Sequence, residues 1–76
     1  MNKARRKTIA NSLATLQDAH KTLKAALEEE KKALLSIPED EDHEEQHEAI
    51  DELIYNLEEG LSSLGDAIDA LESTDF

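Results

Sequence analysis

The 76 residues contain no cysteine and no tryptophan, and only one proline, two glycines and two aromatic residues. Without cysteine the chain can form neither a disulfide nor a thiolate metal site, which is typical of proteins in a reducing cytoplasm. No apolar run approaches the roughly 18 residues that cross a membrane, and the first residues lack the charged-then-apolar pattern of a secretion signal. We therefore expect a soluble cytoplasmic protein with no membrane partner.

The usual residue patterns of catalysis are also missing. No nucleophile is paired with a base, and no glycine-rich stretch resembles a phosphate-binding loop, so we expect no enzymatic activity. Nineteen acidic residues outnumber eight Lys and Arg, which gives a net charge of −11. This charge repels phosphate, and only Tyr55 and Phe76 offer aromatic rings for stacking on bases, so direct nucleic-acid binding is not expected.

Apolar residues recur in steps of four and three along two long stretches. The positions are Ile9, Leu13, Leu16, His20, Leu23, Leu27, Glu30, Leu34 and Ile37, then His43, His47, Ile50, Ile54, Leu57, Leu61, Leu64, Ile68 and Leu71. A heptad repeat sustained in this way predicts long helices that pack side by side. Small residues at the flanking g positions, such as Ala19 and Ala26, widen the stripe as in a helical bundle.

A bend is expected between the two stretches, at Ser36 to Glu39. Ser36 and Glu39 have the spacing of a capping box, and Pro38 is tolerated in the first turn of a helix. We therefore predict a single all-α domain over residues 1–76, a long antiparallel helical hairpin with helix one at about 3–35, a turn at 36–38 and helix two at about 39–73.

A chain of 76 residues buries only about 60% of its unfolded surface, so one core is marginal. Two helices packed only on each other would also leave part of the apolar stripe in water. We therefore expect a homodimer or higher homo-oligomer, with two hairpins forming a four-helix bundle. The heptad repeat keeps the same phase before and after Gly60 and Gly65. We therefore interpret these glycines as points of close approach between helices or of a mild kink, and not as a reversal of the chain.

Charge divides at the bend. Residues 1–38 hold all eight Lys and Arg against four acids, a net charge of +4, whereas residues 39–76 hold fifteen acids and no Lys or Arg. In a hairpin the basic start would lie beside the acidic end, Asp66, Asp69, Glu72 and Asp75. We expect these ends to pair, although exposed ion pairs contribute only about 0–1 kcal/mol each.

Four stretches together resemble a known group of proteins. They are the basic start Arg5-Arg6-Lys7, the turn Ile37-Pro38-Glu39, and the repeats that cover 49–53 and 67–72, AIDEL and AIDALE. With its two long heptad stretches, the chain resembles small acidic two-helix proteins encoded by bacteriophages and other bacterial mobile elements, a group without an assigned function. The resemblance implies a cytoplasmic accessory protein of the bacterial host cell, made during phage or element growth.

The acidic surface of helix two is the first candidate site. Its members are Glu44, Glu45, Glu48, Asp51, Glu52, Glu58, Glu59, Asp66 and Asp69. Carboxylates spaced along a rod can imitate DNA phosphates and occupy a basic groove on a host or element protein. The alternative is that these charges only keep the helix soluble.

A metal site near the turn is the second candidate. Counting outward from the turn, facing residues should have numbers that sum to about 75, which places Glu30 near His43 and His47. Glu44-x-x-His47 has the spacing used in di-iron carboxylate bundles, so a dimer would supply a site for Zn, Fe or Mn. The alternative is that these polar side chains are merely solvated at the hairpin end.

Two further candidates involve basic groups. The patch Lys3, Arg5, Arg6 and Lys7 could bind a small nucleotide signal in an oligomeric sponge, or pair with the acidic end of helix two. His20 lies in mid-stripe, opposite Ile54 to Leu57 by the same counting rule. It is expected to fix register or oligomeric state as a polar core residue, or to make assembly pH-sensitive.

Overall fold

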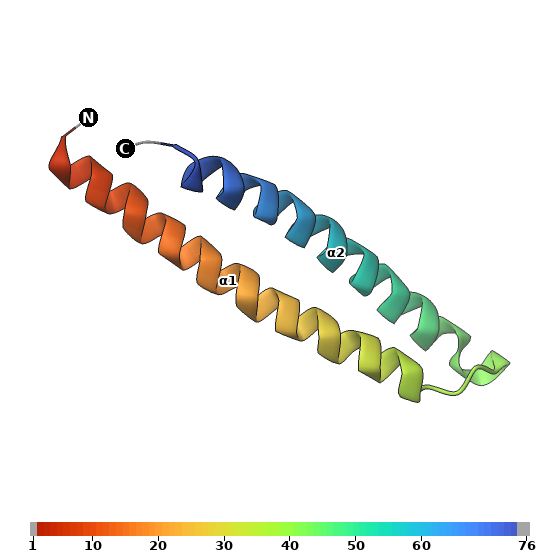
Figure 1. Cartoon of the computed structure of the whole chain (residues 1–76). Helices are drawn as coiled ribbons and strands as arrows, with labels where there is room; N and C mark the ends of the chain where they lie inside the picture. Colours follow the sequence, from red (N-terminus) through yellow and green to blue (C-terminus); the bar gives the residue numbers. More distant parts are fainter. Residues whose placement is uncertain (1, 75–76) are drawn as a thin grey trace.

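The computed structural model describes residues 2–74, which fold into two long antiparallel helices joined by a short connector (Figure 1). Helix α1 spans Lys3–Ser36, a 3₁₀ turn η1 spans Glu41–His43, and helix α2 spans Glu44–Glu72. The prediction of an all-α helical hairpin is confirmed. The rod measures 60 × 15 × 14 Å, and its radius of gyration of 17.6 Å exceeds the roughly 11 Å of a compact chain of this length.

Helix α1 begins and ends at residues with clear local reasons. The side chain of Asn2 accepts a hydrogen bond of 2.8 Å from the Arg5 backbone N–H, which caps the first turn. At the other end Pro38 disfavours helical backbone at the residue before it. Ile37 accordingly adopts φ −88° and ψ 129°, and the helix stops at Ser36.

The bend is built differently from the expected capping box. The Ser36 hydroxyl donates to the Ala33 carbonyl at 2.7 Å, so Ser36 closes α1 instead of capping a second helix. Asp40 takes the capping role, because its carboxylate accepts from the His43 backbone N–H at 3.1 Å. The second α-helix therefore begins at Glu44 rather than 39. It also runs without interruption past both Gly60 and Gly65.

The core is thin because only two helices contribute to it. The buried side chains are Leu27, Ile54, Leu61 and Ile68, each 6–8% exposed. Leu34, Ile50 and Leu57 pack against the first three. None of the described side chains is less than 2% exposed, so the hairpin has a central contact line rather than a closed interior.

The register, meaning which residues of α1 lie opposite which residues of α2, differs from the counting rule. The Gln17 amide donates to the Glu72 carboxylate at 2.6 Å, and a Cβ placed on Gly65 would lie 3.6 Å from Nε2 of His20. Facing residue numbers therefore sum to 85–89. The longer connector and the later start of α2 account for this shift.

The shift leaves the two helices unequal at the open end of the hairpin. By this register Glu72 lies level with residues 13–17, so the start of α1 extends about three to four turns, roughly 15–21 Å, past the end of α2. Figure 1 shows this overhang at the red end of α1. Residues Lys3–Lys7 within it are all exposed and are called the basic overhang below.

Candidate protein-interaction surface

The carboxylates of α2 occupy one flank of the helix. With the buried residues Ile54, Leu61 and Ile68 at heptad position a, all ten acidic residues of Glu44–Glu72 fall at positions e, b and f. These three positions are neighbours around a helix and span about 100°. This acidic flank contains the nine expected residues, all of them exposed: Glu44, Glu45, Glu48, Asp51, Glu52, Glu58, Glu59, Asp66 and Asp69.

No Lys or Arg within residues 2–74 is in direct contact with this flank, although Lys24 of α1 lines a surface hollow together with Glu58. The one contact below 4.0 Å between a basic nitrogen and a carboxylate in this part of the chain is local, a hydrogen bond of 2.6 Å from Nδ1 of His43 to Asp40. The acidic flank holds ten carboxylates over 29 residues, or about one per 4 Å of helix axis. A DNA strand carries one phosphate per about 3.4 Å, so the two charge densities are similar.

The opposite flank of α2 carries no charge at all. Its g positions are Gln46, Leu53, Gly60 and Ala67, and its c positions are Ala49, Asn56, Ser63 and Ala70. In an antiparallel helix pair the g positions of the two helices lie on the same side. On α1 those positions are Arg5, Ser12, Ala19, Ala26 and Ala33. The hairpin therefore has a charged side and a second side whose charges are only Arg5 in the overhang and Glu29 at position c; it is called the uncharged side below.

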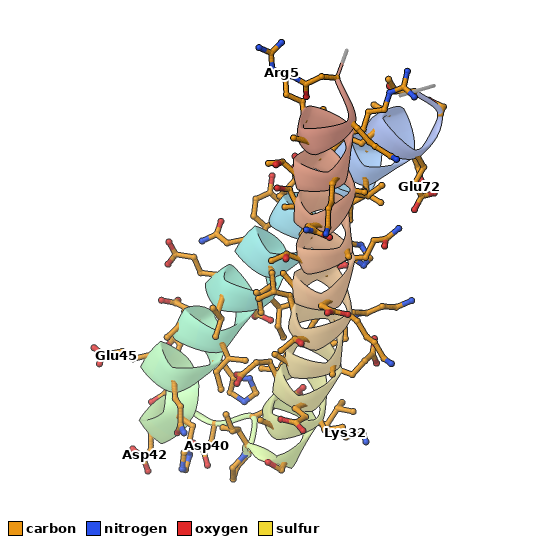
Figure 2. The ribbon with its side chains drawn as sticks, turned by 90° about the vertical axis from the view of Figure 1, so that its left-hand side faces the viewer. Arg5, Lys32, Asp40, Asp42, Glu45 and Glu72 are labelled. Atoms are coloured by element: carbon orange, nitrogen blue, oxygen red, sulfur yellow. The ribbon has the colours of Figure 1, made fainter. Side chains whose placement is uncertain are left out.

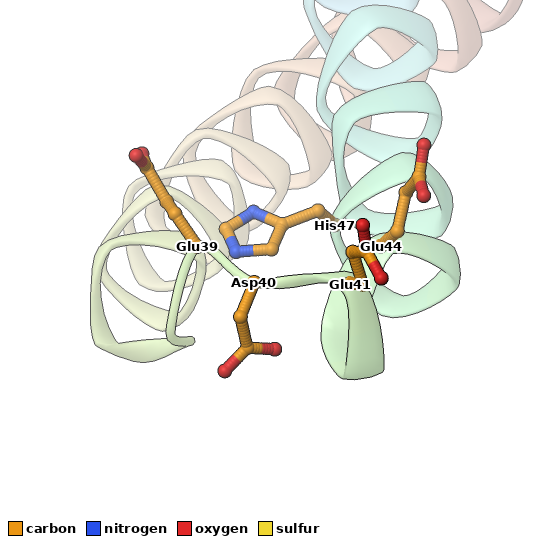
Figure 3. Close-up of a pocket in the computed structure, with 5 residues that line it drawn as sticks. All are labelled: Glu39, Asp40, Glu41, Glu44 and His47. Atoms are coloured by element: carbon orange, nitrogen blue, oxygen red, sulfur yellow. The ribbon is translucent and has the colours of Figure 1, made fainter.

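The connector is held by one histidine of α2. Nε2 of His47 donates to the carbonyl oxygens of Pro38, at 2.9 Å, and of Ile37, at 3.2 Å. Figure 3 shows the ring of His47 extending from α2 into the bend, in a surface hollow lined also by Glu39, Asp40, Glu41 and Glu44. The carboxylates of Glu39 and Asp40 point away from the ring in opposite directions, so the hollow has acidic walls that do not converge.

The structure does not bring the four expected metal ligands together. The register places Glu30 near the level of Tyr55 to Glu59, about two to three turns from His47 along α2. Nε2 of His47 is already bonded to the connector, and Nδ1 of His43 donates to Asp40. No three His, Asp or Glu side chains within residues 2–74 are arranged to hold a metal ion.

The expected pairing of the basic start with the acidic end is not made by the described residues. Lys3, Arg5, Arg6 and Lys7 lie in the basic overhang, beyond the level of Glu72, and form no ion pair there. Figure 2 shows Arg5 directed away from the helices at the open end. The later start of α2 removes its end from reach, and Asp75 lies outside the described residues.

His20 is half-buried and lies opposite Gly65, not opposite Ile54 to Leu57. It lines two adjacent surface hollows, one with Ile68 and one with Leu27. Its ring makes no hydrogen bond to the described residues, and no half-buried polar atom among them is sealed from water without a partner. His20 therefore interrupts the apolar contact line at a position where water still reaches it.

Sequence inspection missed two residues that shape these surfaces. Asp40 caps the turn that precedes α2, a role that was assigned to Ser36. Gln17 bonds to Glu72 across the hairpin, and no sequence pattern marks such a long-range bond.

The two glycines were expected to mark close approach or a mild kink rather than a chain reversal. Helix α2 continues past both of them. A Cβ added to Gly60 would meet nothing within 4 Å, so no part of the described hairpin approaches this glycine closely.

The chain matches no family model, no curated protein and no solved structure in the comparisons made. None of the described helices combines the length and apolarity that a membrane span requires. The geometry and the charge of the two flanks are therefore the basis for a functional proposal.

Proposed function

We propose that this chain is a non-enzymatic protein-interaction module whose acidic flank binds the basic surface of a host or element protein. The observation that carries the proposal is the row of ten exposed carboxylates on α2, without a Lys or Arg within 4.0 Å. Exposed carboxylates that are not in direct contact with a cation attract a cationic partner. Its charge spacing resembles that of a DNA strand, so a nucleic-acid-binding groove is the partner surface of matching chemistry.

The resemblance to small acidic proteins of bacteriophages and mobile elements supplies the proposed context. In that context the chain is an accessory protein of the bacterial cytoplasm that competes with DNA for a host protein and thereby inhibits it.

The proposal also includes assembly. Two hairpins would form a four-helix bundle, because each one exposes apolar side chains beside its thin core, including Leu23 at 40% and Leu53 at 44%. Assembly through the uncharged side leaves the acidic flank exposed for the partner. The two activities therefore use different surfaces and can be tested separately.

The acidic flank is tested by capture from a bacterial lysate on immobilised protein. In the test variant Glu45→Gln, Glu52→Gln and Glu59→Gln replace three carboxylates at position f of α2. The matched control carries Asp18→Asn, Glu28→Gln and Glu29→Gln, which remove the same charge from exposed positions of α1. Wild type and control should retain the same nucleic-acid-binding proteins at low salt, and the test variant should lose them.

Two further conditions sharpen this experiment. Added duplex DNA should displace the captured proteins, because both ligands compete for one basic groove. Raising the salt from about 0.05 M to 0.5 M should also release them, since exposed charges are screened over a few Å at high ionic strength. Equal capture by the test variant and the wild type would reject the acidic flank as the binding surface.

A further inference from the structure

The uncharged side of the hairpin exposes a row of apolar side chains. On this side lie Leu16, Leu23 and Ala26 of α1 and Leu53, Leu57 and Leu64 of α2, all exposed or half-buried. The rod as a whole has an accessible surface of 5948 Å², compared with about 4,700 Å² for a compact monomer of the same mass. A standard dimer interface buries about 800 Å² per partner, so association along one side would return the surface per chain to the range of a compact protein.

Gly60 supports the same surface independently. It lies at position g between Leu53 and Ala67, inside a continuous helix where glycine costs about 1 kcal/mol relative to alanine. The hairpin itself offers no reason for this cost, because the space beside Gly60 is open. Missing side chains at such a point allow the backbone of another helix to approach closely.

Charge is distributed unequally along the rod. By the observed register, residues 28–57 form the half that contains the connector, with twelve acids against two lysines and a net charge of −10. The described residues of the other half, 2–27 and 58–74, hold six acids and six Lys or Arg, which gives zero. Figure 2 shows the contrast between the ends, with Arg5 at one end and Asp40, Asp42 and Glu45 at the other.

We propose that a second copy of this chain covers the uncharged side end over end, so that each basic overhang lies beside the acidic connector of its partner. Two hairpins with both connectors at the same end would bring two charges of −10 together. The reversed orientation separates these charges and places Lys3–Lys7 of each chain near the connector carboxylates of Glu39–Asp42 in the other. A two-fold axis across the middle of the rod makes this contact twice.

This inference rests on the assembly part of the proposed function and adds the orientation and the residues of the interface. It also gives the basic overhang a role that the isolated hairpin does not provide. In the proposed dimer the overhang contacts the connector of the partner copy.

The chain has no cysteine, so single labels report orientation cleanly. We would place a spin label at Asp42→Cys, an exposed position of the connector, and measure the label-to-label distance in the dimer by dipolar spectroscopy. In the end-over-end dimer the labels are separated by about the length of α2, roughly 40 Å or more. With both connectors at one end, helix spacings of about 10 Å keep the labels within roughly 25 Å.

Sedimentation equilibrium supplies the second measurement. We expect twice the chain mass of 8.5 kDa at micromolar concentration. Arg5→Glu with Arg6→Glu should weaken the dimer at least tenfold at low salt and much less at high salt. Lys21→Glu with Lys24→Glu makes the same charge change outside the overhang and should leave the dimer intact. Helicity by circular dichroism confirms that each variant is folded.

Each outcome decides between distinct claims. A short label distance would overturn the end-over-end orientation but leave the bundle standing. A folded monomer at about 100 µM would overturn the dimer altogether. Neither result would affect capture by the acidic flank, because the glutamine variants of that flank are measured by lysate binding and not by mass.

Discussion

The a and d positions of the heptad repeat have the same chemistry in sequence, yet the hairpin treats them differently. At position a, Leu27, Ile54, Leu61 and Ile68 are buried to 6–8% exposure. At position d, Leu57 and Leu64 are only half-buried, and Leu23 is 40% exposed. In this hairpin the helices turn the central a positions more directly toward each other than the d positions, while Leu13 and Leu34 at the outer a positions are half-buried. The difference shows that the repeat specifies more contacts than one hairpin satisfies.

The losses in the free energy of unfolding caused by substitutions at positions a and d should therefore differ most at low protein concentration. Leu61→Ala removes a buried a-position side chain and should lower the free energy of unfolding by about 2–3 kcal/mol. Leu23→Ala removes a d-position side chain that water already reaches and should cost about 1 kcal/mol or less. Thermal unfolding followed by circular dichroism measures both.

Protein concentration sharpens this comparison. If a second copy covers the d positions, the cost of Leu23→Ala should grow as the concentration rises, while the cost of Leu61→Ala within the hairpin changes little. Equal and concentration-independent costs would indicate that the hairpin alone accounts for the burial at both positions.

His20 is the polar residue among the a positions of α1. Replacing it tests whether the polar ring is needed for stability or for the choice of oligomeric state. Its ring makes no hydrogen bond to the described residues and lies beside Gly65 and Ile68. His20→Leu should raise the free energy of unfolding by about 1 kcal/mol, because apolar contact replaces a hydrated ring. Denaturant unfolding measures the change, and sedimentation shows whether the choice of oligomeric state loosens.

His47 supplies the matched control for this substitution. Its ring donates to the carbonyl oxygens of Ile37 and Pro38, so His47→Leu leaves both acceptors without this donor and should lower stability. A large loss of stability in His20→Leu would contradict the prediction, since it would show that the His20 ring makes an essential polar contact.

The sequence was sufficient to predict the helical hairpin and the stripe that each helix turns inward. Heptad spacing depends only on helix geometry, and it survives in the structure from Ile9 to Leu71. The point at which the bend begins could not be predicted, because Ser36 and Asp40 are both good caps four residues apart. Pro38 decided between them by forcing Ile37 out of helical conformation.

That local choice had consequences for every predicted contact across the hairpin. Starting α2 at Glu44 shifted the register, separated Glu30 from His43 and His47, and moved the acidic end of α2 away from the basic overhang. The acidic flank was less sensitive, because its members lie on one helix and depend on the period of that helix alone. Sites within one element were thus predicted more reliably than sites that combine two.

The two glycines of α2 give the finest test of the difference between the inward and the uncharged side. Gly65→Ala places a Cβ in ordinary contact, 3.6 Å from the ring of His20, and should stabilise the chain by roughly 0.5–1 kcal/mol at every concentration through helix propensity.

Gly60→Ala enters open space in the hairpin and should give a similar gain in stability when the chain is monomeric. At concentrations that favour the dimer its gain should shrink or reverse, because the added methyl group meets the second copy. Melting temperatures of both variants across a concentration series measure this, and a gain for Gly60→Ala that stays equal to that of Gly65→Ala throughout would remove Gly60 from the interface.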